Sequence, residues 1–178
     1  SEAYGIELRC DSFPLNRFLP ADSLGLLDLA LQAGGSGFDP LRAQTRGNIR
    51  LQVDRAEFRG RDFGGVELNA NLEGGQLSGR LSDRDEALRL LLLVSGTLTE
   101  RKQEVRLTGN VFDFDLAELG ISPQKIGGSF ALEAGASASD AGSYTARIAL
   151  DSIEVRTRHR PDRIRPTSLS LSSDTTAT

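Results

Sequence analysis

The stretch VELNANLEGGQLSGRL, residues 66–81, decides the fold because it holds two alternating segments around a pair of glycines. Apolar residues stand at every second position from Val66 to Leu72, which is typical of a strand with one face in water. The same spacing resumes from Leu77 to Leu81, after Gly74 and Gly75. A two-glycine link between alternating segments predicts a hairpin. The stretch therefore predicts two antiparallel strands.

The same alternation continues through most of the chain. It is found at residues 6–10, 27–33, 49–53, 66–72, 77–81, 88–94, 105–111, 130–134, 146–150 and 153–155. Short polar links join these ten segments, so they predict strands in an antiparallel meander. The alternation slips by one residue between Val53 and Ala56, and again between Leu150 and Ile153. Each slip predicts a bulge or a bend.

Two stretches interrupt the alternation with helical spacing. In FPLNRFLPADSLG, residues 13–25, the apolar residues are Leu15, Phe18 and Leu19, and Leu116 and Leu119 are spaced similarly in FDFDLAELGISPQKIGG, residues 112–128. We expect two very short helices, the second capped by the acids at positions 113 and 115. A shift of about 101–103 residues aligns the two stretches and the strands around them. Residues 1–178 are therefore interpreted as one segment of a repetitive domain, with repeats over about 6–104 and 105–178, the second truncated.

The composition of the chain includes few large apolar side chains that could fill a thick core. Of its 178 residues, 38% are hydrophobic, 19 are glycine, and none is tryptophan or methionine. The formal net charge of −4 lacks the basic surplus of a nucleic-acid-binding domain, so nucleic acid is not expected as a partner. The longest apolar run, residues 88–94, is far shorter than the about 20 residues of a membrane helix. Any signal or anchor is expected outside this fragment.

A sheet with one apolar face must bury that face against something. The sheet either closes into a β-sandwich or curves into an open groove with an accessible inner face. An extendable repeat favours the open, strongly curved antiparallel sheet. The segment at 88–94 is apolar on both sides, because Leu91 and Leu93 face away from Leu90 and Leu92. Its back is expected to contact another part of the chain or a neighbouring segment.

The stretches FPLNRFLPADSLGL and FDLAELG and the closing IRPTSLSLSSDTT resemble the TamB family, the translocation and assembly module. TamB is a branch of the AsmA-like family of Gram-negative cell-envelope proteins. The resemblance implies a taco-like β-groove with an apolar inner face, in a periplasmic protein anchored in the inner membrane outside this fragment. It also implies transport of phospholipid between the two membranes during outer-membrane biogenesis. The alternative is a scaffold or chaperone that inserts outer-membrane proteins together with an Omp85-type barrel.

The expected partners are phospholipid acyl chains, an Omp85-family outer-membrane protein and β-barrel client proteins. A sugar-binding β-sandwich is a more remote alternative. The residues expected to line the groove are Leu29, Leu31, Leu51, Val53, Leu68, Leu90, Leu92, Leu107, Leu132, Ile148 and Leu150. A basic run is expected either to be a solvated strand face or to contact lipid head groups or a partner, through Arg156, Arg158, Arg160, Arg163 and Arg165.

No catalytic, metal or cofactor site is predicted, and the chain is not expected to be an enzyme. His159 is the only histidine and stands among arginines. Cys10 is the only cysteine, so no internal disulfide can form, and its place in an alternating segment predicts a small buried hydrophobe. The acids in DRDE, residues 83–86, lack the spacing of a calcium loop and are interpreted as a solvated hairpin tip.

Overall fold

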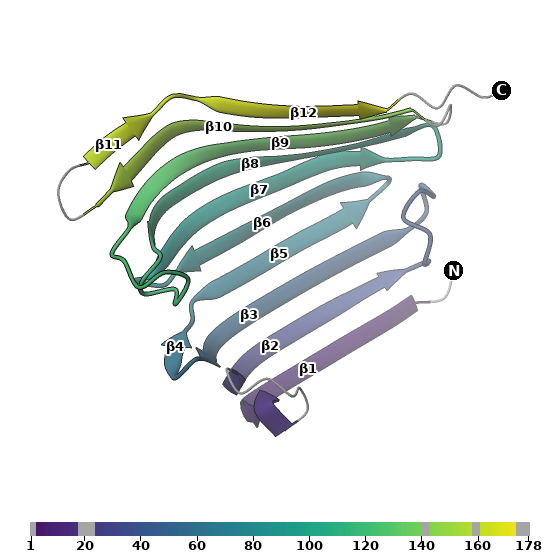
Figure 1. Cartoon of the computed structure of the whole chain (residues 1–178). Coiled ribbons are helices and arrows are strands. Elements are labelled where there is room, and N and C mark those ends of the chain that lie inside the picture. The colour runs from purple at the N-terminus through teal and green to yellow at the C-terminus, as the bar shows by residue number, and fades with distance from the viewer. Residues whose placement is uncertain (1–2, 18–23, 140–142, 158–160, 174–178) are drawn as a thin grey trace.

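The computed structural model describes residues 3–17, 24–139, 143–157 and 161–173. These residues form a single 12-stranded antiparallel sheet, as the sequence predicts (Figure 1). The strands are β1 (Ala3–Pro14), β2 (Leu24–Ser36), β3 (Arg46–Phe58), β4 (Arg61–Phe63), β5 (Val66–Glu73), β6 (Gln76–Arg84), β7 (Leu88–Leu98), β8 (Lys102–Asp115), β9 (Gly127–Ser139), β10 (Tyr144–Arg156), β11 (Pro161–Ile164) and β12 (Thr167–Ser173). Neighbours in the sheet follow chain order from β1 to β11, except that β4 pairs only with β3 and β12 pairs with β10.

The sheet is open. Its path begins at β1 and ends at the β10 partners β11 and β12, and no pairing joins these margins among the described residues. Figure 1 shows a curved and twisted sheet with β1 at one margin and β12 at the other. The described residues contain no second layer, so the closed β-sandwich considered from the sequence is wrong.

The hairpin predicted at residues 66–81 is confirmed. Leu72 of β5 lies opposite Leu77 of β6, and Gly74 and Gly75 form the turn with φ angles of 58° and 74°. Two successive residues at positive φ match the twist of a two-residue hairpin, and glycine adopts this conformation without steric cost. The other strands pair through similarly local connections, which makes the whole sheet a meander with two short side branches.

Both predicted slips are β-bulges. In β3 the pairing with β2 passes from Val53 to Arg55 and leaves out Asp54. In β10 the pairing with β9 shifts between Asp151 and Glu154, where Ser152 has a φ of 52°. The segments at 146–150 and 153–155 are consequently one bulged strand rather than two. β1 also contains a bulge, between residues 10 and 13. The sequence does not predict it, because the helical spacing that follows hides the slip in the alternation.

The two interruptions differ from each other. The first is a 3-10 helix, η1 (Leu15–Arg17), and Phe18 and Leu19 lie outside the described residues. The second forms hydrogen-bonded turns over residues 116–120 and is not a helix, so that prediction is wrong. Gly120, at a φ of 69°, and Pro123 follow the first turn closely and prevent its extension.

The two acids before these turns also differ in role. Asp115 caps them as expected, because its Oδ1 accepts hydrogen bonds from the backbone N–H groups of Ala117 at 2.8 Å and Glu118 at 3.1 Å. Asp113 instead lies between Arg89, at 3.9 Å, and Arg156, with which it forms a hydrogen-bonded ion pair. Only one of the two carboxylates therefore has the capping role expected of both.

Two parts of the sheet have the same pairing pattern. In the first, β1, β2 and β3 are followed by β4 and then β5, both paired with β3. In the second, β8, β9 and β10 are followed by β11 and then β12, both paired with β10. The pairing shift after Cys10 in β1 has a counterpart after Val111 in β8, 101 residues later. The repeat of about 101–103 residues itself stays a prediction.

Candidate functional site

Residues that lie directly opposite each other in an antiparallel sheet project from the same face. The pairings therefore define rows of side chains that cross the sheet from β1 to β12. One of them, the leucine row, contains eight leucines interrupted only by a glycine and ended by a threonine. Its members are Leu8, Leu31, Leu51, Leu68, Leu81, Leu92, Gly109, Leu132, Leu150 and Thr167.

The rows beside the leucine row on the same face are also apolar. One runs through Ile6, Ala33, Ile49, Ala70, Gly79, Val94, Leu107, Ala134, Ile148 and Leu169. On the other side, Cys10, Leu29, Val53 and Val66 are successive partners, as are Leu90, Val111 and Phe130. All eleven residues expected to line the groove lie on this face, which is called the inner face below. Cys10 is partly buried there, opposite Leu29.

The inner face is the concave side of the sheet. A Cβ atom added at Gly79 would lie 3.0 Å from the Cβ of Ala70 and 2.8 Å from a methyl carbon of Val94. Opposite Cβ atoms are normally about 4.5–5.5 Å apart, so the strands are inclined toward each other on this side. Neighbouring leucines agree with this direction: Leu92 on the inner face is partly buried, whereas Leu93 on the opposite, outer face is 47% exposed.

Nothing in the described part of the chain covers the inner face. Ile6 is 59% exposed and Leu169 is 69% exposed, at the two margins of the sheet. Ala87 and Val111 are the only buried hydrophobic residues among those described, and no side chain is fully enclosed. Large uncovered apolar surfaces on proteins usually mark binding sites. The inner face is therefore the candidate functional site.

Three connections meet at one end of the groove. The β3–β4 hairpin donates two hydrogen bonds to the β8–β9 connection, from Arg59 in its turn to the carbonyl of Gly120 at 2.9 Å and from Arg61 at the start of β4 to the carbonyl of Glu118 at 2.7 Å. Arg61 also pairs with the Glu118 carboxylate at 2.6 Å. The β6–β7 turn joins them through Asp85, which accepts the N–H of Gly64, directly after β4, at 3.1 Å, and through the carbonyl of Ala87, which accepts the N–H of Asp115 at the end of β8 at 3.0 Å. These contacts fix the three turns relative to one another.

Among the described residues, the inner face carries one buried acid beside this end. Asp83 of β6 lies opposite Leu90 and is 9% exposed. Its Oδ1 accepts the N–H of Asp85 at 2.9 Å. Burial raises the pKa of the Asp83 carboxyl above its ordinary value of 3.8, and the nearby Asp85 charge acts in the same direction against backbone hydrogen bonds that lower it. The interpretation of DRDE as a solvated hairpin tip is thus wrong for Asp83.

Asp83→Asn is expected to raise stability at neutral pH, because the amide keeps the acceptor for Asp85 and removes the buried charge. A folded-state pKa above the unfolded value contributes stability below pH 3.8 that is lost as pH rises through the folded pKa. The thermal midpoint of the variant should therefore exceed that of the parent at pH 7, and the gap should close below pH 3.8. Asp11→Asn, at an exposed acid, is the control. A gap independent of pH would contradict the assignment.

The predicted basic run is only partly described. Arg158 and Arg160 lie outside the described residues. Arg156 is engaged with Asp113, whereas Arg163 and Arg165 are exposed on β11 and just after it. Arg163 lies opposite Glu154 across the β10–β11 pair. The described arginines of this run are therefore spread along a branch of the sheet and are not gathered on the inner face.

The central strand β7 has no layer on its back. Leu93 projects from the outer face and remains 47% exposed, so the expectation that another part of the chain packs there is wrong for the described residues. The described residues contain no cluster of three or more histidine, cysteine or acidic side chains that could hold a metal ion. They also contain no helix with the length and apolar character needed to cross a membrane. His159 is outside the described ranges.

Neither a protein-family model, nor a curated protein, nor a solved structure matches this chain.

Proposed function

We propose that the chain is a segment of a periplasm-spanning β-groove that carries phospholipid between the inner and outer membranes. The observation that carries the proposal is the uncovered leucine row, which extends across the sheet from Leu8 in β1 to Leu150 in β10. A continuous apolar surface of this length suits a long apolar ligand. The resemblance to the TamB family supports the same function and the same location.

Acyl chains fit the chemistry of the inner face. Each methylene group that leaves water for an apolar surface gains about 0.8 kcal/mol, without any need for directional contacts. The leucine row offers such a surface, and its members repeat from strand to strand without a charged side chain. A charged head group can stay in water at the open mouth while the chains lie against the groove. The row offers similar apolar contacts at each strand. A lipid can therefore move along it from strand to strand, because no single tight binding site holds it in place.

Photocrosslinking from neighbouring positions tests this function. A photoreactive side chain at Leu51 lies on the inner face, whereas one at Gln52 lies on the outer face of the same strand. With the purified protein and phospholipid vesicles, we expect lipid adducts at position 51 and almost none at position 52. Equal labelling at the two positions, or no phospholipid in the purified protein by mass spectrometry, would refute the proposal.

A second candidate function rests on the free edge of the sheet. β1 is 12 residues long and pairs only with β2 in the described part of the chain, so its other edge is open to strand addition. A scaffold for outer-membrane protein insertion, working with an Omp85-type barrel, would use such an edge to hold a client strand. Crosslinks from β1 to a β-barrel client, retained when the inner face cannot bind lipid, would favour this function.

A further inference from the structure

Four arginines form a second regular feature, on the outer face. Arg50 of β3 and Arg80 of β6 belong to one row, because both are linked through the pairings of Asn69 in β5. Arg106 of β8 and Arg147 of β10 both lie opposite Gly135 of β9, in the adjacent row. The four residues, called the arginine row below, thus occur on every second strand from β3 to β10. Consecutive members are about 10 Å apart across the strands.

The members of the arginine row have no acidic partner within salt-bridge distance among the described residues. Neighbouring basic residues on the outer face have acidic partners: Arg46 pairs with Glu73 at 3.5 Å, and Lys102 pairs with Glu104 at 2.7 Å. The hydrogen bond from Lys102 lowers the pKa of Glu104, so this acid stays ionised and engaged with the lysine, although the Arg106 charge also lowers this pKa. Arg50 donates a hydrogen bond to the neutral amide of Asn69 at 3.1 Å.

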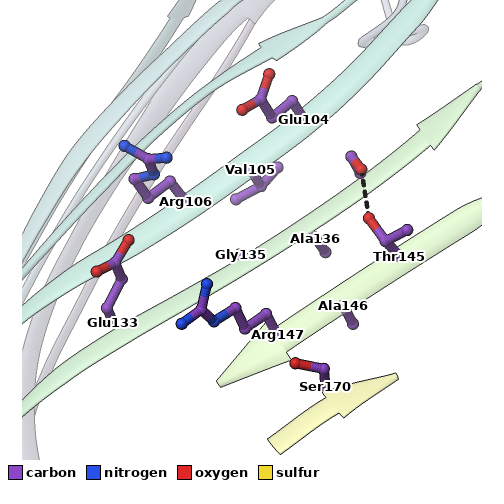
Figure 2. Close-up of a pocket in the computed structure, with 11 residues that line it drawn as sticks. Glu104, Val105, Arg106, Glu133, Gly135, Ala136, Thr145, Ala146, Arg147 and Ser170 are labelled. Atoms are coloured by element: carbon purple, nitrogen blue, oxygen red, sulfur yellow. Dashed lines mark hydrogen bonds between the residues drawn. The ribbon is translucent and has the colours of Figure 1, made fainter. Parts of the chain in front are cut away.

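Two open depressions on the outer face lie between consecutive arginines. The first, of about 510 Å³, has Arg50 and Arg80 on its two sides and amide and hydroxyl groups on its floor. The second, of about 410 Å³, lies between Arg106 and Arg147, where Gly135 has no side chain to fill it (Figure 2). The hydroxyls of Ser137 and Thr145 are hydrogen-bonded at 2.7 Å beside it. The first depression thus joins two guanidinium groups to neutral polar groups, whereas the lining of the second also includes the carboxylates of Glu104 and Glu133.

We propose that the outer face binds a linear polyanion carrying phosphate or sulfate groups, which lies across the strands along the arginine row. Guanidinium groups recognise such anions through paired, charge-assisted hydrogen bonds. A single exposed arginine binds weakly, but four on alternate strands make each further contact intramolecular. The sheet twists between β3 and β10 (Figure 1), and a flexible linear chain can follow such a twist more readily than a flat membrane surface can.

The test is binding of inorganic polyphosphate and of dextran sulfate by fluorescence anisotropy over a range of salt concentrations. We expect both polymers to bind, free inorganic phosphate to compete poorly at equal phosphate concentration, and affinity to fall steeply with salt. The double variant Arg106→Gln/Arg147→Gln should bind about tenfold more weakly and reduce the slope of log affinity against log salt by about two. Binding of one polymer alone would assign the anion as phosphate or sulfate.

Two matched variants separate the arginine row from net charge. Arg42→Gln removes a positive charge that already pairs with Asp39 at 3.2 Å, so polymer binding should not change. Glu133→Gln removes the exposed acid that lines the second depression, so binding should become several-fold tighter. Unchanged affinity in the double arginine variant, an equal loss in Arg42→Gln, or anionic vesicles binding more tightly than either polymer would overturn the proposal. Circular dichroism confirms that each variant is folded.

Discussion

Leu92→Asp is expected to reduce phospholipid binding about tenfold or more, while Leu93→Asp leaves it unchanged. The two residues are adjacent in β7 and project from opposite faces of the sheet. An aspartate at position 92 places a carboxylate in the leucine row between Leu81 and Gly109, where an acyl chain would have to desolvate it. An aspartate at position 93 stands on the outer face, where the native leucine is already 47% exposed. Phospholipid bound to the purified variants is measured by mass spectrometry.

Both variants are expected to keep the fold. Leu92 is not fully buried, because the inner face is uncovered in the described part of the chain, so water can hydrate the new carboxylate. Circular dichroism and the thermal midpoint should therefore agree closely between the two proteins. If Leu92→Asp unfolds while Leu93→Asp does not, the inner face is a closed core in solution. If both fold and bind equal amounts of lipid, the groove is not the lipid site.

The sequence predicts the strands well because period-2 alternation is a local property. The glycine pair at 74 and 75, and the slips around Asp54 and Ser152, translate directly into a turn and two bulges. The prediction of the second helix is wrong because helical spacing over one turn does not show that Gly120 adopts a positive φ and ends the turn there. Alternation does not distinguish a sandwich from an open sheet, because both architectures require one apolar face per strand.

The properties of the two faces depend on register, which sequence spacing does not contain. Arg50, Arg80, Arg106 and Arg147 are irregularly spaced along the chain, and only the strand pairings place them on every second strand. The burial of Asp83 is similarly invisible in the sequence, where DRDE has the composition of a polar turn. The leucine row was easier to anticipate because almost every inner position is apolar, so any register shift by an even number of residues still gives an apolar face.

Gly79→Val is expected to lower the free energy of unfolding by about 1–3 kcal/mol, the usual cost of overpacking. Its first added carbon would lie 3.0 Å from the Cβ of Ala70 and 2.8 Å from a methyl carbon of Val94, so the three strands must separate on their concave side. Valine normally favours strands, so its intrinsic propensity opposes this effect. The change is measured by chemical denaturation, with the same dependence of unfolding free energy on denaturant concentration in variant and parent. It can also be measured as a drop of about 2–4 °C in thermal midpoint per kcal/mol.

Gly5→Val is the matched control for this prediction. It introduces the same side chain into edge strand β1, at an exposed glycine where an added Cβ would have nothing within 4 Å. Because no contact opposes the valine there, its strand propensity should leave stability unchanged or slightly higher. The difference between the two variants therefore isolates the crowding created by curvature. If Gly79→Val proved as stable as Gly5→Val, β5, β6 and β7 would not be inclined toward each other, and the inner face would be flat rather than a groove.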